Sequence, residues 1–220
     1  MRHLDGLDFH PQVTFLVGEN GSGKSTLLEA IAICLGFNPE GGTKNFHFST
    51  RASHSELHQY IRLAKGGKRP RDGFFLRAES FFNVATEIEN LDSEPSFGPP
   101  VIDSYGGLSL HEQSHGESFL ALLISRFRGH GLYLLDEPEA ALSPQRQLAV
   151  LARLHELVRA GSQFVIATHS PILMAYPDAW IYNLTGGGVE LVDYYDTEHY
   201  RVMHDFMVDT KRMLDMLIDE

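Results

Sequence analysis

The chain has 220 residues, enough for one substantial domain with a buried core, and 43% of them are hydrophobic, which is typical of a globular protein. Eighteen Lys and Arg against 29 Asp and Glu give a net charge of −11, which excludes an overall positive field that would attract nucleic acid. No segment approaches the roughly 20 apolar residues of a membrane span, no signal peptide opens the chain, and the single cysteine excludes an intrachain disulfide, so we expect a cytoplasmic protein.

The first strong pattern is a glycine-rich loop between a strand and a helix. Val13–Val17 is a short apolar run that predicts a buried strand, and Leu27–Leu35 predicts a helix that ends at Gly36. Between them, Gly18–Ser25 fits G-x-x-x-x-G-K-[ST], a loop whose backbone N–H groups surround phosphates. Lys24 should reach the β- and γ-phosphates, and the Ser25 hydroxyl should bind Mg²⁺. The expected nucleotide-binding residues here are Gly18, Glu19, Asn20, Gly21, Ser22, Gly23, Lys24, Ser25 and Thr26.

Residues 37–112 have weaker strand signals, and we expect them to form an inserted, mainly helical lobe. Ser53 and Glu56 have the spacing of a capping box, which predicts a helix that ends before Gly66. The other elements expected in this range are a strand at Phe74–Arg77, a helix at Phe81–Leu91 and a loop at Ser93–Pro100.

A local excess of positive charge lies within residues 61–77, where six basic residues accompany one acid, Asp72. The basic residues are Arg62, Lys65, Lys68, Arg69, Arg71 and Arg77. Two interpretations are open: a solvated surface, or a surface that contacts the phosphates of a nucleic acid.

The second half alternates between helices and strands, which predicts a single α/β domain over residues 1–220 with a largely parallel core sheet. It should end in a β-hairpin around Gly186–Gly188 and a last helix capped by Thr197. The elements expected here are helices at Ser118–Phe127, Gln145–Val158 and 198–217, and strands at Leu132–Leu135, Phe164–Ala167, Trp180–Leu184 and Val189–Val192.

Three polar side chains follow predicted core strands. Asp136 and Glu137 come directly after Leu132–Leu135, and His169 follows Phe164–Ala167. Ligand sites of α/β sheets lie at the carboxyl ends of the strands. We therefore expect Asp136 to hold Mg²⁺, Glu137 to orient and deprotonate a water molecule, and His169 to contact the γ-phosphate.

Ser114, Gly116 and Glu117 precede the helix Ser118–Phe127, where a serine and a glycine at a helix start can bind an anion. By itself this pattern is more often explained by a plain helix cap. Its position before the Leu132–Leu135 strand makes it a candidate part of the nucleotide site.

Taken in order, these motifs resemble the ABC ATPase family over nearly the whole chain. Gly18–Thr26 is similar to its Walker A motif, Gln113–Glu117 to its signature, Leu132–Glu137 to Walker B, Ala141–Ser143 to the D-loop and His169 to the switch histidine. The resemblance implies a P-loop NTPase core that hydrolyses ATP with Mg²⁺. It also implies a head-to-tail dimer with a second copy, in which each signature covers the ATP on the partner's Walker A motif.

The sequence departs from the family pattern in the signature, where Gln113 and His115 replace the usual Leu and Gly. No glutamine follows the Phe74–Arg77 strand, so Glu79 is our substitute as a third metal ligand. The residue that stacks on adenine is not located by the motifs.

Two roles are compatible with this resemblance. The residues of Gly18–Ser25 and of Gly116–Phe119 resemble the corresponding motifs of ATPases of the SMC and SbcC-like group. This resemblance implies a role in DNA repair or phage defence, with duplex DNA or a nuclease as the partner. Only 87 residues separate Thr26 from Ser114, too few for long coiled-coil arms. The alternative is the cytoplasmic ATP-binding subunit of a transporter, which energises a separate membrane permease. We favour the first role on the signature; Glu137 argues against a binding module without hydrolysis.

Overall fold

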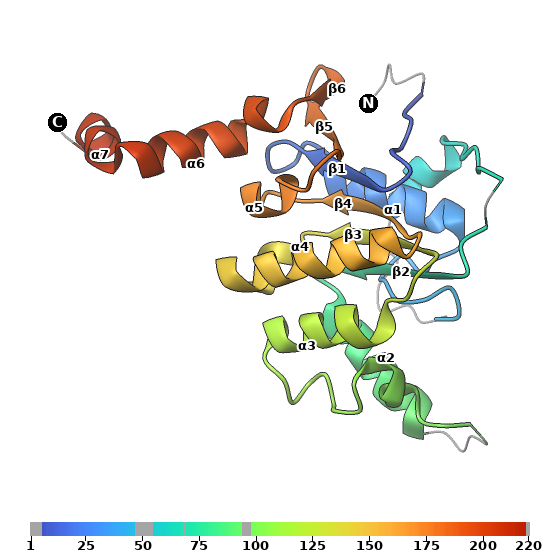
Figure 1. Cartoon of the computed structure of the whole chain (residues 1–220). Helices are drawn as coiled ribbons and strands as arrows, with labels where there is room; N and C mark the ends of the chain where they lie inside the picture. The colour runs from blue at the N-terminus through green and yellow to red at the C-terminus, as the bar shows by residue number, and fades with distance from the viewer. Residues whose placement is uncertain (1–5, 47–54, 68, 94–97, 219–220) are drawn as a thin grey trace.

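The computed structural model describes residues 6–46, 55–67, 69–93 and 98–218. These residues form one six-stranded sheet with the strand order β2-β3-β4-β1-β5-β6 (Figure 1). Neighbouring strands run parallel except for β6, which pairs antiparallel with β5. The strands are β1 (Val13–Val17), β2 (Asp72–Arg77), β3 (Gly131–Asp136), β4 (Gln163–Ala167), β5 (Trp180–Thr185) and β6 (Gly188–Val192). The predicted α/β class with a largely parallel sheet is confirmed.

Helices cover both faces of the sheet, because successive side chains of a strand point to opposite faces. On one face, Leu16 and Leu134 pack with residues of α1 (Lys24–Leu35). On the other, Phe15 and Leu135 pack with α2 (Phe81–Ser93), α3 (His115–Ala121) and α4 (Pro144–Arg159) (Figure 1). The core strands are buried on both sides, which explains why they read as continuous apolar runs.

Short helical turns connect these elements. They are η1 (Glu56–Gln59), η2 (Val101–Tyr105), a π-helical turn η3 (Leu122–Arg126) that continues α3, η4 (Pro138–Ala141), α5 (Pro171–Met174) and η5 (Tyr194–Asp196). The chain then enters α6 (Glu198–Val208) and α7 (Thr210–Ile218), which project away from the sheet (Figure 1). Among the described helices, none has the length and apolar character needed to cross a bilayer.

The structure differs from the expectations at three places. Range 37–112 is not a separate lobe, because its predicted strand Phe74–Arg77 is β2, which pairs with β3 throughout its length in the core sheet. Ser53 lies outside the described residues; the cap is Ser55, whose side chain accepts from the Leu57 N–H, and only the four-residue η1 follows. The last helix is broken at Asp209, whose backbone leaves the helical region at φ −142° and ψ 68°.

The packing of α4 generates the first prediction. Leu154 is fully buried on this helix, whereas Leu148 on the same helix is 57% exposed. Leu154→Ala should lower the free energy of unfolding by about 2–5 kcal/mol, because the buried cavity collapses only in part. Leu148→Ala should change it by less than about 0.5 kcal/mol. Urea unfolding of both variants tests this, and equal midpoints would contradict the packing described.

Candidate active site

The glycine-rich loop connects β1 to α1 through backbone conformations that favour glycine. Gly18 has φ +139°, and a Cβ atom there would lie 2.3 Å from the Leu184 carbonyl oxygen of β5. Gly23 has φ 95° and precedes the first residue of α1 without any side-chain cap. The first N–H groups of α1 therefore face the loop, at the helix end that carries partial positive charge.

Lys24 is the buried cation of this loop, with 4% of its surface exposed. Its Nζ donates hydrogen bonds to the carbonyl oxygens of Gly18 and Glu19, at 2.8 and 2.9 Å. Burial lowers the pKa of Lys24, and the nearby charges of Glu137, Asp136 and Glu139 oppose that shift. Since these three carboxylates act on the ammonium, the acids that follow β3 and the phosphate loop share one site.

Asp136 is the last residue of β3 and is 5% exposed. Burial raises its pKa to about 6, although a hydrogen bond from the Ser25 hydroxyl and the charge of Arg77 oppose the rise. Its Oδ1 atom is buried and has no hydrogen-bond partner among the described residues, and the same is true of Ser22 Oγ. Buried polar atoms are rarely left without a partner, so these two atoms are available to a ligand.

Glu137 follows Asp136 in a left-handed backbone conformation, with φ 51° and ψ 51°. This conformation costs a non-glycine residue about 1–2 kcal/mol, and such strain is concentrated at functional sites. The Glu137 N–H donates to the Ala167 carbonyl oxygen at 2.9 Å, which ties the residue to the end of β4. Its side chain is 41% exposed, and its Oε1 lies 3.7 Å from His169 Nε2.

His169 lies just beyond β4, opposite Glu137. Its backbone N–H donates to Oε1 of the half-buried Glu139 at 2.5 Å, and its Nδ1 lies 3.0 Å from Nε2 of His199. Burial, followed by the charge of Lys24, lowers the pKa of His169, while Glu137 opposes the shift. The predicted residues Lys24, Glu137 and His169 are therefore neighbours.

The predicted signature residues form a different group at the start of α3. Ser114 caps the helix, and both its N–H and its hydroxyl donate to Glu117 Oε2, at 3.1 and 2.6 Å. Glu117 also pairs with Arg146 of α4 at 3.3 Å. Gly116 is buried, and a Cβ atom on it would lie 2.7 Å from the Ala141 carbonyl oxygen. Ser114 and Glu117 are exposed and bond to each other, not to the phosphate loop of their own chain.

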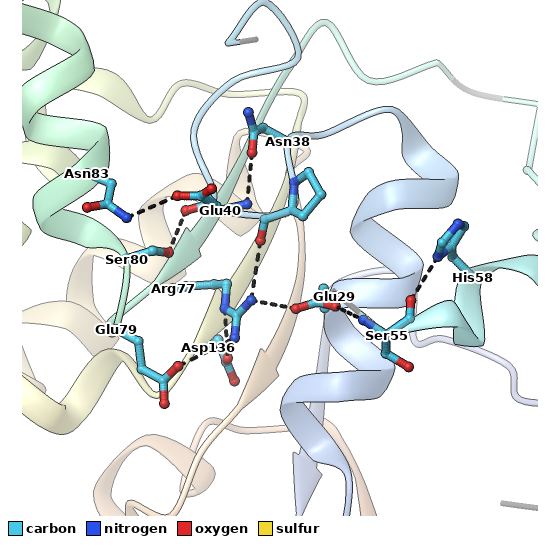
Figure 2. Close-up of polar contacts among 11 residues, drawn as sticks. Glu29, Asn38, Glu40, Ser55, His58, Arg77, Glu79, Ser80, Asn83 and Asp136 are labelled. Carbon is cyan, nitrogen blue, oxygen red and sulfur yellow. Dashed lines mark hydrogen bonds and ion pairs between the residues drawn. The ribbon is translucent and has the colours of Figure 1, made fainter. Parts of the chain in front are cut away.

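Arg77 stands at the centre of an ion-pair network beside the acids (Figure 2). Its guanidinium lies 2.5 Å from Glu29 Oε2 on α1, 3.5 Å from Glu79 Oε2 and 3.8 Å from Asp136 Oδ2. Its NH1 also donates to the Pro39 carbonyl oxygen at 3.3 Å. Arg77 is thus part of the site and not of a basic surface, which corrects its assignment to the 61–77 group.

Glu79, the expected third metal ligand, is 84% exposed along its side chain and faces Arg77 (Figure 2). Its charge reaches Asp136, where it contributes to the raised pKa. The structure places it beside the acids, with the guanidinium as its ion-pair partner. A metal role for Glu79 stays a prediction.

Four residues of the site were not found by sequence reasoning: Glu29, Arg77, Glu139 and His199. Glu29 lies among apolar helix residues and reads as a solvated helix position, yet it is 5% exposed. A buried charge within an apolar run is the signal that could have identified it, because unpaired charges are not buried. Nothing in the local sequence indicates that His199, 30 residues beyond His169, contacts it.

A glycine-rich loop with a buried lysine after β1, a histidine after the adjacent parallel strand β4 and two acids at the end of β3, the strand beyond it, define the class of P-loop NTPases. A family described as an AAA domain matches residues 2–94. The cytochrome c biogenesis ATP-binding export protein CcmA of Rhodopseudomonas palustris is 30% identical over 185 residues, which cover 78% of this chain and 86% of that protein.

The cell division ATP-binding protein FtsE of Haemophilus influenzae is 29% identical, over 76% of this chain and 82% of its own length. Among solved structures, the SMC head domain from Thermotoga maritima aligns with 84% of this chain and 91% of its own, at 17% identity and a TM-score of 0.42. The chain belongs to the ABC-type ATP-binding proteins, and it is an ATPase.

The raised pKa of Asp136 generates a stability prediction. A folded-state pKa of about 6 against 3.8 means that the ionised carboxylate destabilises the folded chain above pH 6. Asp136→Asn, without nucleotide or metal, should raise the free energy of unfolding by about 2–3 kcal/mol near pH 8. The gain should shrink as the pH falls from about 6 to about 4, where the wild-type carboxylate takes up its proton.

Urea unfolding across this pH range measures the effect. Asp215→Asn is the matched control, because Asp215 is exposed on α7. A gain at position 136 that does not depend on pH, or no gain at all, would contradict the buried-charge description.

Proposed function

We propose that this ATPase hydrolyses ATP with Mg²⁺ at the site formed by the phosphate loop, Asp136, Glu137 and His169. The observation that carries the proposal is that Glu137 Oε1 lies 3.7 Å from His169 Nε2, while Glu137 and Asp136 are near enough to Lys24 for their charges to act on its pKa. One cation, two carboxylates and an imidazole thus lie near one another at the carboxyl ends of the strands.

The residues fit Mg²⁺ as well as phosphate. A hard cation prefers oxygen ligands, and Asp136 offers a buried oxygen without a partner beside the Ser25 hydroxyl. Among the described residues, no group of three or more His, Cys, Asp or Glu side chains could hold a metal alone. The ion would therefore bind through Ser25, Asp136 and phosphate oxygens together, which makes its binding dependent on nucleotide. When bound, it would neutralise charge on the phosphates.

Each of the other residues has a distinct task in this proposal. Lys24 donates to the β- and γ-phosphate oxygens in place of the carbonyl groups it now contacts. Glu137, which is partly exposed, orients a water molecule and accepts its proton. His169 donates to the γ-phosphate from the same side as Glu137. The strained backbone of Glu137 aims its carboxylate at this point.

We propose further that the site is completed by a second copy in head-to-tail orientation. Ser114 and Glu117 are exposed at the start of α3 and bind no group of their own phosphate loop. Membership of the ABC family supports a role for them on the partner's ATP. Gly116 allows this segment to pack tightly on the Ala141 region.

The partner that this cycle drives is, in our proposal, a separate membrane permease, with the chain on the cytoplasmic side. Two relatives carry the names of an ATP-binding export protein and a cell division ATP-binding protein, and this chain covers more than four-fifths of each. The first of these names favours the transporter role over the DNA role that the signature style indicated.

A DNA-dependent role remains the second candidate because of one observation. Arg62, Lys65, Arg69 and Arg71 are all exposed, while Lys68 lies outside the described residues. Exposed basic side chains in one segment can contact the phosphates of duplex DNA. A partner nuclease belongs to the same interpretation.

Glu137→Gln tests the hydrolysis and the dimer together. The variant should bind ATP and Mg²⁺, lose at least about 100-fold in kcat because the proton acceptor is gone, and elute as a dimer on size exclusion with ATP. Lys24→Ala should bind no nucleotide, as measured by calorimetry, and stay a monomer. A Glu137→Gln protein that hydrolyses ATP at the wild-type rate would contradict the role of Glu137 as proton acceptor. A variant that stays monomeric with ATP would contradict the head-to-tail dimer.

To distinguish a permease from DNA as the partner, the ATPase rate is measured with and without duplex DNA at a fixed salt concentration of about 0.1 M. The transporter role predicts no stimulation by DNA. A DNA role predicts stimulation that is lost when Lys65 and Arg69 are changed to Glu and is retained when Lys211 and Arg212, exposed on α7, are changed in the same way. Stimulation with that pattern would overturn the permease proposal.

A further inference from the structure

The switch-like histidine His169 is in contact with the C-terminal part of the chain. Its Nδ1 atom lies 3.0 Å from Nε2 of His199, and the two rings are 5.1 Å apart between centroids. His199 belongs to the first turn of α6, the helix that leaves the body of the molecule (Figure 1). The opposite ring atom, His169 Nε2, faces Glu137 and is buried without a hydrogen-bond partner among the described residues.

The first turn of α6 is held firmly, so the position of His199 is defined. Thr197 is 3% exposed, its hydroxyl donates to the Tyr194 carbonyl oxygen at 2.8 Å, and it accepts from the Tyr200 N–H at 3.3 Å. The Tyr200 ring packs on Tyr194 and Tyr195, with centroids 4.8 and 5.0 Å apart. Beyond this turn, α6 and α7 contain no buried residue.

The roles of the two rings in this contact depend on which nitrogen of His169 carries the proton. A neutral imidazole has one N–H donor and one acceptor nitrogen. Both Glu137 and a phosphate oxygen are acceptors, so His169 can serve them only if the proton is on Nε2. Its Nδ1 must then accept a hydrogen bond, and the nearest donor is the Nε2–H of His199. Burial lowers the pKa of both histidines, which favours two neutral rings.

We propose that His199 is a positioning residue, which donates from Nε2 to His169 Nδ1 and so holds His169 as the Nε2–H tautomer, turned toward Glu137 and the γ-phosphate. This inference rests on the proposed role of the site in ATP hydrolysis. Through His199, α6 would affect the reaction although the helix itself does not contact ATP. A displacement of the first turn of α6 would release the tautomer, so the C-terminal helices and the nucleotide site are coupled in both directions.

The tautomer can be measured in the protein without nucleotide by long-range ¹H–¹⁵N NMR of the histidine rings. His169→Gln and His199→Gln identify the signals of the two residues. In the wild-type protein, His169 should show the pattern of a ring with the proton on Nε2. A proton on Nδ1 would overturn the proposal without the need for any activity assay.

Two variants of position 199 separate hydrogen bonding from packing. His199→Phe keeps a ring but removes the donor, and it should mix the His169 tautomers and lower kcat about 10–100-fold, the usual cost of losing such a supporting hydrogen bond. KM for ATP should change less than about twofold, because Lys24 and the loop are untouched. His199→Gln retains an N–H donor and should recover most of the lost kcat and the Nε2–H pattern.

The control is His204→Phe, one turn further along α6, which should leave kcat and the His169 signals unchanged. A His199→Phe enzyme with wild-type kcat, or a His199→Gln enzyme as slow as His199→Phe, would overturn the role of His199 while leaving ATP hydrolysis intact. If instead the wild-type protein hydrolyses no ATP, the proposed function fails, and the NMR pattern alone decides whether His199 sets the tautomer.

Discussion

The attraction between one buried ammonium and three carboxylates is the interaction on which this site depends. Lys24 is buried at the start of α1, and Glu137, Asp136 and Glu139 oppose the lowering of its pKa. These groups come from loops that follow β1 and β3, with β4 between the two strands. Because these strands are parallel, their carboxyl ends share one edge of the sheet. A change of strand order would separate Lys24 from these carboxylates and leave the buried ammonium without a counterion.

This arrangement places considerable cost on the folded state. Burial raises the pKa of Asp136 and of Glu139, and Glu137 adopts a left-handed backbone conformation. Arg77 compensates in part, since its guanidinium reaches both Glu29 and Asp136 (Figure 2). Ligand sites are commonly less stable than their surroundings, because groups arranged for a phosphate and a metal are not fully satisfied by one another. The well-packed layers on both faces of the sheet offset this cost.

Much of this could be predicted from the sequence, for a local reason. The Gly18–Ser25 loop, the apolar strand before Asp136 and the strand before His169 are each encoded within about ten residues, and the rule that ligands bind at strand carboxyl ends unites them. The strand Phe74–Arg77 within residues 37–112 was predicted, but its place at the edge of the core sheet was not, because its partner β3 lies far along the chain. The pairs Glu29–Arg77 and His169–His199 join residues 48 and 30 positions apart, and no periodic pattern reports such contacts.

Gly116 allows the start of α3 to pack closely on the segment before α4. With no side chain of its own, it leaves room for the Ala141 carbonyl oxygen and for Arg146, whose NH1 would lie 2.5 Å from an added Cβ atom. Glu117 holds the same arginine from the next position. The first turn of α3 is therefore packed directly against η4 and the first turn of α4. Because a Cβ atom at position 116 would collide with the Ala141 carbonyl oxygen, a shift of η4 toward α3 requires the start of α3 to move with it.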